Sequence, residues 1–208
     1  MKKHLVIVFL LLTGFSVCAQ NNSNNSILVV GDSLSAAYGL EVEQGWVALL
    51  QARLQQHGSS VRVTNISISG ETTSGALTRL PEALRQYGSG IVVIELGGND
   101  GLRGISLTQM QGNLERMVQM SLEQGARVLI LGVRLPPNYG PVFNERFQQV
   151  FKDVAVETGV EYLPAFMRGI ADKRELMQSD GIHPTKEAQL MLLDNVWPRI
   201  RSMLGSRG

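Results

Sequence analysis

The sequence has little of what marks a disulfide-stabilised, nucleic-acid-binding or membrane-spanning protein. Its 208 residues contain one cysteine, Cys18, so no disulfide can form within the chain. The formal net charge is +1 and the charges form no basic or acidic block, which gives no sign of a nucleic-acid or anionic-membrane partner. After the first twenty residues, no segment is long and apolar enough to cross a bilayer. Function must therefore be inferred from local motifs.

The first nineteen residues have the pattern of a signal peptide. Two lysines precede the apolar run at residues 5–12, and residues 17–19 (VCA) form a small-residue cleavage site. We expect residues 1–19 to be removed on export to the periplasm or beyond it, and Cys18 would be removed with them. Two alternatives remain: an uncleaved N-terminal anchor, and a lipoprotein that carries its lipid on Cys18.

Along the rest of the chain, short apolar runs alternate with helical patterns. The predicted strands are residues 27–30, 61–66, 91–96, 128–133 and 160–163. Helical spacing of apolar residues predicts helices around residues 46–54 and 114–122, and a last helix over residues 186–203. This alternation, without repeat or linker, predicts a single α/β domain over residues 27–208 with a parallel sheet and helices on both faces.

Polar residues follow three of the predicted strands, and ligands of parallel sheets bind at the carboxyl ends of the strands. The first strand ends in residues 31–35 (GDSLS), the second in residues 65–70 (NISISG) and the third in residues 97–100 (GGND). These turns should therefore meet at one edge of the sheet. A fourth polar cluster, residues 179–185, lies just before the last helix.

Ser33 is the candidate nucleophile, and it needs a base that removes its proton. Of the three histidines, His4 belongs to the predicted signal peptide, and His57 is expected to be exposed at the C-terminus of a helix. His183 is therefore the candidate base, and Asp180, three residues earlier in a glycine-containing turn, can hold one ring nitrogen. The alternatives are that Ser33 only caps a helix and that His183 only bonds its own turn.

A serine hydrolase also needs donors for the oxyanion of its tetrahedral intermediate. The candidates are the backbone N–H groups of Ser33, near an expected helix start, and Gly70, and the side-chain amide of Asn99. Gly70 could instead be an ordinary turn residue, and Asn99 a left-handed one. Asp32 and Asp100 are predicted to brace the turns that contain Ser33 and Asn99.

Together these blocks resemble the SGNH hydrolases, also called GDSL esterases. Ser33 in GDSLS, Gly70, Asn99 in GGND and His183 in DGIHP supply the four lettered residues in order. The chain also has no G-x-S-x-G nucleophile elbow, which disfavours the larger α/β-hydrolase fold.

Two longer stretches, residues 97–104 (GGNDGLRG) and 134–140 (RLPPNYG), are similar to a periplasmic subgroup with acyl-CoA thioesterase, lysophospholipase and arylesterase activities. The resemblance implies a three-layer α/β/α sandwich with a flavodoxin-like, five-stranded parallel sheet. It also implies ester and thioester hydrolysis through an acyl-enzyme at Ser33, with Asp180 and His183 completing the triad and with no metal or organic cofactor.

The acyl chain of such a substrate needs an apolar groove. We predict that Leu102, Leu135, Pro136 and Ile182 line it, although ordinary loop residues could be exposed there incidentally. The expected partner is a small-molecule acyl ester or thioester, and a monomer is the default. Two other functions remain open: a carbohydrate O-acetyl esterase with the same site, and a non-catalytic flavodoxin-like module that binds a phosphate at the Ser33 turn.

The export prediction can be checked by N-terminal sequencing. If residues 1–19 are a signal peptide, the soluble, active protein from a periplasmic fraction begins at Gln20 or within about two residues of it. Active soluble protein that still carries Met1 would contradict the prediction.

Overall fold

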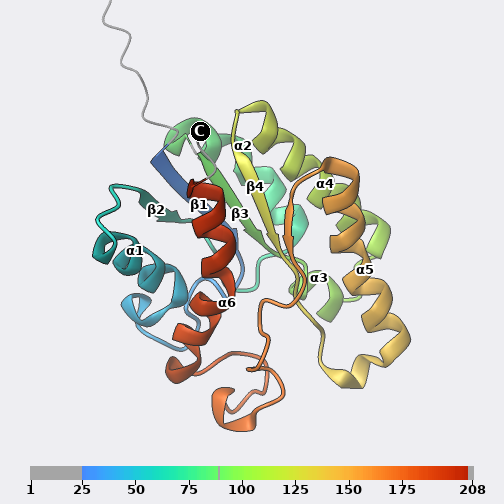
Figure 1. The fold of residues 1–208 in the computed structure, drawn as a ribbon. Helices are drawn as coiled ribbons and strands as arrows, with labels where there is room; N and C mark the ends of the chain where they lie inside the picture. Colours follow the sequence, from blue (N-terminus) through green and yellow to red (C-terminus); the bar gives the residue numbers. More distant parts are fainter. Residues whose placement is uncertain (1–24, 89, 206–208) are drawn as a thin grey trace, which may run out of the picture.

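The structure is a computed structural model that describes residues 25–88 and 90–205 (Figure 1). Within them lies a five-stranded sheet in the order β2-β1-β3-β4-β5, and every strand pair is parallel. This strand order is the flavodoxin-like one. The strands are β1 (Ser26–Gly31), β2 (Arg62–Asn65), β3 (Ile91–Glu95), β4 (Arg127–Leu131) and β5 (Glu161–Leu163).

Helices cover both faces of the sheet, so the predicted three-layer α/β/α sandwich is confirmed (Figure 1). One layer consists of α1 (Trp46–Gln56) and α6 (Lys186–Gly205), which pack against each other. The other layer contains α2 (Thr73–Tyr87), α4 (Leu107–Glu123) and α5 (Pro141–Thr158), with α4 between the other two. The connections contain the short helix α3 (Gly98–Leu102) and the 3-10 turns η2 (Val42–Gln44), η3 (Pro137–Tyr139) and η4 (Arg174–Leu176).

The sheet is the centre of the hydrophobic core. All five residues of β3 are buried, as are the last five of β1, because helices cover both faces of these central strands. This explains why their sequences, apart from Glu95 at the end of β3, are apolar without alternation. Two helices, α2 and α5, are absent from the sequence prediction, although buried residues at helical spacing lie in each, such as Phe147, Phe151 and Val154 of α5. In α2 the pattern is interrupted by Pro81.

No helix among residues 25–88 and 90–205 has both the length and the apolar character needed to span a membrane. The predicted signal peptide and Cys18 lie outside the described residues.

Gly97 makes the sharp turn that leads from β3 into α3. Its φ of 110° lies in the left-handed region, and a Cβ at this position would lie 3.0 Å from Cζ of Phe151 and 3.2 Å from Cε of Met110. Only glycine satisfies both the backbone and the packing here. The turn therefore brings α3, and with it Asn99, close against the sheet edge.

We predict that Gly97→Ala lowers the free energy of unfolding by about 2–4 kcal/mol, because backbone strain and overpacking add. Gly125→Ala is the matched control: its φ is 75°, but no atom lies within 4 Å of the added Cβ. The control should lose only about 1 kcal/mol, from the backbone alone. Urea unfolding of both variants measures the difference, and equal losses would show that Phe151 and Met110 do not restrict this position.

Candidate active site

Ser33 lies in the turn that follows β1, at the carboxyl edge of the sheet. The Asp32 N–H donates to the Glu95 carbonyl over 3.2 Å, which continues the β1–β3 pairing up to the residue before Ser33. Residues 33–39 form consecutive turns rather than the helix expected there. Ala37, with φ of 59°, and Gly39, with φ of 74°, have left-handed backbones, which end a helix before it can form. Because no helix starts here, the interpretation of Ser33 as a helix cap is wrong.

His183 reaches Ser33 from a loop 150 residues further along the chain. Its Nε2 lies 2.8 Å from Ser33 Oγ, and its Nδ1 lies 2.7 Å from Asp180 Oδ2. The structure thus brings the three predicted residues together in one hydrogen-bonded chain. With Asp180 as acceptor, the neutral imidazole carries its proton on Nδ1 and presents Nε2 as an acceptor to the serine hydroxyl.

The loop that carries Asp180 and His183 is held by its own hydrogen bonds. The second oxygen of Asp180, Oδ1, accepts the backbone N–H groups of Ile182 (2.9 Å) and His183 (3.0 Å). The Gln178 N–H donates to the His183 carbonyl over 2.7 Å. Asp180 therefore shapes the loop with one oxygen and orients the imidazole with the other.

Asp180 is ionised under ordinary conditions. Desolvation by the surrounding protein opposes ionisation and is the largest single influence on its pKa. The hydrogen bonds from the His183 side chain and from the backbone N–H groups of His183 and Ile182 together outweigh it, so the pKa of Asp180 falls to about 2. A carboxylate that stays charged can stabilise an imidazolium formed beside it.

Tyr38 covers one side of the imidazole, a contact that the sequence analysis missed. The ring centroids of Tyr38 and His183 lie 4.3 Å apart, at a tilt of 35°. Gln178 Nε2 donates to the carbonyls of Tyr38 (2.8 Å) and Pro184 (3.0 Å), and so connects the Ser33 turn to the His183 loop. No sequence pattern pairs Tyr38 with His183, because their contact depends on the fold.

Asn99 lies in the first turn of α3, where its side chain faces the Ser33 turn. Its Nδ2 donates to Asp32 Oδ2 over 3.1 Å. Ala37 is the only non-glycine residue with positive φ in the described part of the chain, so the left-handed interpretation of Asn99 is wrong. Gly97, two residues earlier, has that conformation instead.

Gly70 follows β2 and has a φ of 79°, a conformation that suits glycine. Arg103 Nη2 donates to the Gly70 carbonyl over 2.8 Å, which ties the Gly70 turn to the end of α3. A Cβ on Gly70 would meet only this guanidinium, at 3.5 Å. The space beside Gly70 is thus open.

The two remaining acids brace the site as predicted. Asp32 Oδ1 accepts the Leu34 N–H over 3.0 Å, and this bond closes the Ser33 turn. Asp100 is fully buried and accepts from the Thr73 N–H (2.9 Å) and the Thr73 hydroxyl (2.5 Å). Asp100 therefore fastens α3 to the N-terminus of α2, just after the Gly70 turn.

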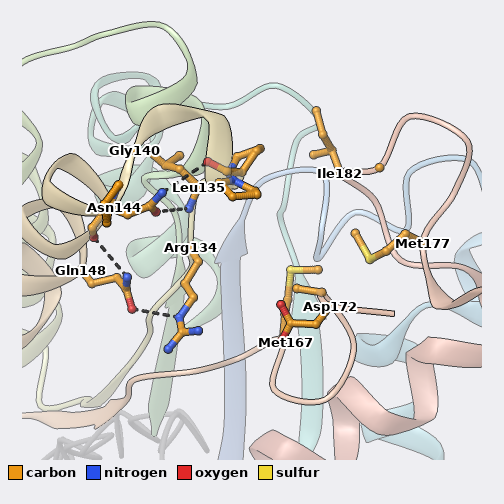
Figure 2. Close-up of a pocket in the computed structure, with 14 residues that line it drawn as sticks. Arg134, Leu135, Gly140, Asn144, Gln148, Met167, Asp172, Met177 and Ile182 are labelled. Atoms are coloured by element: carbon orange, nitrogen blue, oxygen red, sulfur yellow. Dashed lines mark hydrogen bonds between the residues drawn. The ribbon is translucent and has the colours of Figure 1, made fainter. Parts of the chain in front are cut away.

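A cavity of about 110 Å³ lies between Ser33, Asn99 and His183, and all four predicted groove residues, Leu102, Leu135, Pro136 and Ile182, line it. A second cavity of about 390 Å³ shares Leu135, Pro136 and Ile182 with the first (Figure 2). The apolar hollow thus runs on beyond the Ser33 turn.

One wall of this hollow is held by polar contacts. Asn144 Oδ1 accepts the Leu135 N–H over 2.9 Å, and Asn144 Nδ2 donates to the Pro136 carbonyl over 3.3 Å (Figure 2). Arg134 Nε donates to Gln148 Oε1 over 3.0 Å. The hydrogen bonds to α5 hold the Arg134 side chain and the backbone of Leu135 and Pro136 against that helix, so the apolar side chains are presented on a fixed loop.

Among the described residues, no group of three or more His, Cys, Asp and Glu side chains could hold a metal ion. The polar groups that line the cavity include the Ser33 hydroxyl, the His183 imidazole and the Asn99 amide. This set suits acyl transfer by a serine nucleophile.

Comparison with known proteins identifies relatives over most of the chain. Residues 29–190 match the GDSL-like Lipase/Acylhydrolase family. The chain is 49% identical to Esterase TesA of Pseudomonas aeruginosa, an alignment that covers 94% of this chain and 98% of that one. It is 40% identical to Thioesterase 1/protease 1/lysophospholipase L1 of Escherichia coli K12, over 92% and 88% of the two chains.

Solved structures agree with these relatives. The fold is similar to that of the psychrotrophic esterase EstA of a Pseudoalteromonas species, in a structure inhibited by monoethylphosphonate. The TM-score is 0.83 and the sequence identity 43%, and the match covers 88% of this chain and 100% of that one.

Proposed function

Because this chain belongs to the GDSL-like lipase/acylhydrolase family and is a serine ester hydrolase, we propose that Ser33 is its nucleophile, His183 its general base and Asp180 the carboxylate that orients the base. The observation that carries the proposal is the continuous chain of hydrogen-bonding contacts, 2.8 Å from Ser33 to His183 and 2.7 Å from His183 to Asp180. The side chain of His183 is mostly buried, while the Asp180 side chain is 37% exposed.

In the first step Ser33 Oγ attacks the acyl carbon while its proton passes to Nε2 of His183. The imidazolium then gives that proton to the departing alkoxide or thiolate, and the acyl group stays on Ser33. A water molecule, deprotonated by His183, attacks the acyl-enzyme in turn. The acid product leaves, and the proton returns to Ser33.

The oxyanion formed in both steps needs donors close to Ser33. We assign this role to the Asn99 amide and to the backbone N–H groups of Gly70 and Ser33. One N–H of Asn99 Nδ2 is used by Asp32, which leaves the second N–H for the cavity. Preorganised donors of this kind stabilise the transition state more than the ground state.

The substrate is an acyl ester or thioester whose chain lies in the hollow lined by Leu102, Leu135, Pro136 and Ile182. Its continuation into the cavity of about 390 Å³ offers more room than an acetyl group fills, which favours longer acyl chains over sugar O-acetyl groups. A non-catalytic binding module would have no use for a histidine between a serine and a carboxylate.

We further propose that the protein acts in the periplasm after loss of residues 1–19.

Substitution of the triad tests the mechanism. Ser33→Ala and His183→Ala should each lower kcat/KM for a p-nitrophenyl ester about 10³-fold or more, and Asp180→Asn should cost less than either. His57→Ala is the matched control, because His57 is the other histidine of the described chain and caps the end of α1. A phosphonate should label Ser33 in the wild type, as seen by mass spectrometry of the peptide. Retained activity in His183→Ala, or no label on Ser33, would refute the proposal.

Chain-length dependence tests the groove. Ile182 is 38% exposed and lines both cavities, so Ile182→Ser should fold and lower kcat/KM for octanoyl esters about 5- to 10-fold more than for acetyl esters. Val156→Ser serves as control, because Val156 is 73% exposed on α5 and belongs to neither cavity lining. Equal losses for both chain lengths in Ile182→Ser would mean that the catalytic loop, rather than the groove, had been disturbed.

A further inference from the structure

The carboxyl group of Glu95 lies beneath the Ser33 turn, next to that of Asp32, and has no role in the mechanism above. Glu95, the last residue of β3, is fully buried, and Asp32 beside it is only 3% exposed. The Asp32 N–H bonds the Glu95 carbonyl, and each carboxyl group influences the pKa of the other. Two ionised carboxylates at close range in a buried site repel each other strongly, so one of them should hold a proton.

The hydrogen bonds around Glu95 indicate which oxygen carries that proton. The Trp46 indole N–H, which can only donate, lies 3.2 Å from Ser35 Oγ. Ser35 therefore accepts from Trp46 and donates its own hydroxyl to Glu95 Oε2, over 2.8 Å. Glu95 Oε1 is buried and receives no N–H or hydroxyl from the described residues. A proton on Oε1 would satisfy this oxygen by donating to Asp32.

The electrostatic environment agrees with this assignment. Burial raises the pKa of Glu95 well above its ordinary value, and the neighbouring charge of Asp32 raises it further. Burial also raises the pKa of Asp32, to about 6, against the opposing influence of the Leu34 N–H, the charge of His183 and the Asn99 amide. Asp32 accepts two N–H donors, from Leu34 and Asn99, whereas the Glu95 carboxyl group accepts only the Ser35 hydroxyl among the described residues, so the charge is better placed on Asp32 and the proton on Glu95.

We propose that Glu95 is a positioning residue: it donates a hydrogen bond to Asp32, and this bond holds the Asp32 carboxylate that orients the Asn99 amide. The proposal rests on the oxyanion role assigned to Asn99 above. Asp32 Oδ1 is held by Leu34, and Oδ2 receives Asn99. Because Asp32 is a charged acceptor, the Asn99 side chain turns its NH2 group, rather than its carbonyl oxygen, toward Asp32. Loss of the Glu95 donor would let Asp32 shift and misdirect the second N–H of Asn99.

A double-mutant cycle tests the proposal. Glu95→Met keeps the size of the side chain but removes its donor and acceptor, and should lower kcat about 10-fold with little change in KM, because a misplaced donor acts mainly in the transition state. Asn99→Ala alone should lower kcat about 10²-fold or more. If Glu95 acts through Asn99, adding Glu95→Met to Asn99→Ala should change kcat less than about 2-fold.

Two further variants separate positioning from simple packing. Glu95→Gln keeps an oxygen that can accept from Ser35 and replaces the acid O–H with an amide NH2 that can donate to Asp32, and should restore kcat to within about 3-fold of the wild type. Ile94→Met disturbs the neighbouring buried residue of β3, whose side chain points to the other face of the sheet, and should lower thermal stability without lowering kcat. The proposal is overturned if Glu95→Met lowers kcat equally in the wild type and in the Asn99→Ala variant. It is also overturned if Glu95→Met does not lower kcat at all.

Infrared spectroscopy of the wild-type protein tests the protonation of Glu95 without depending on whether any variant folds. With 13C-labelled glutamate, the C=O band of a protonated carboxylic acid at neutral pH should shift relative to unlabelled protein. The absence of such a band would overturn the proposal. A fully active Asn99→Ala enzyme would instead refute the oxyanion assignment, and the infrared band would then still show whether Glu95 holds a proton.

Discussion

The pairing of β1 with β3 is the constraint on which the rest of the site depends. Gly31 lies opposite Glu95 in the register, and the next backbone bond joins Asp32 to the Glu95 carbonyl. The turns that leave these two strands must therefore start side by side. Ser33 and Asn99, which are far apart in the sequence, are thereby brought together, and Asn99 donates to the carboxylate of Asp32, the residue next to Ser33. The geometry of the proposed active site therefore follows from strand register rather than from a rigid local motif.

The histidine is supplied in a different way. Its loop belongs to no strand, and its shape comes from the local bonds of Asp180 to the Ile182 and His183 N–H groups. Gln178 then links this loop to the Tyr38 carbonyl in the Ser33 turn. A self-contained loop fastened at a few points can present His183 accurately, because Asp180, which holds its Nδ1, lies only three residues earlier in the same loop.

Much of this architecture could be predicted from sequence because it depends on short-range patterns. The buried strands are nearly continuous apolar runs, and the polar turns follow them directly, so the sheet edge and the grouping of Ser33, Asn99 and His183 could be expected. The helix expected to start near Ser33 does not form, and the left-handed backbone of Ala37, which prevents it, has no signature in its residue type. Contacts such as that between Tyr38 and His183 depend on tertiary packing, so no fixed spacing in the sequence predicts them.

Glu95 illustrates why buried polar residues are the hardest to interpret from sequence. In a strand of otherwise apolar residues, an acid would ordinarily be placed at the solvent-exposed end. Here the strand ends under the Ser33 turn, so the same position becomes fully buried. Burying an acid costs free energy unless it is neutral and its polar atoms are paired. Ser35 pairs one oxygen of Glu95, and in the proposed arrangement Asp32 accepts a proton from the other. The neutral form that burial favours is also the form that can donate to Asp32, so the energetics of burial and the orientation of the Asn99 amide require the same protonation state.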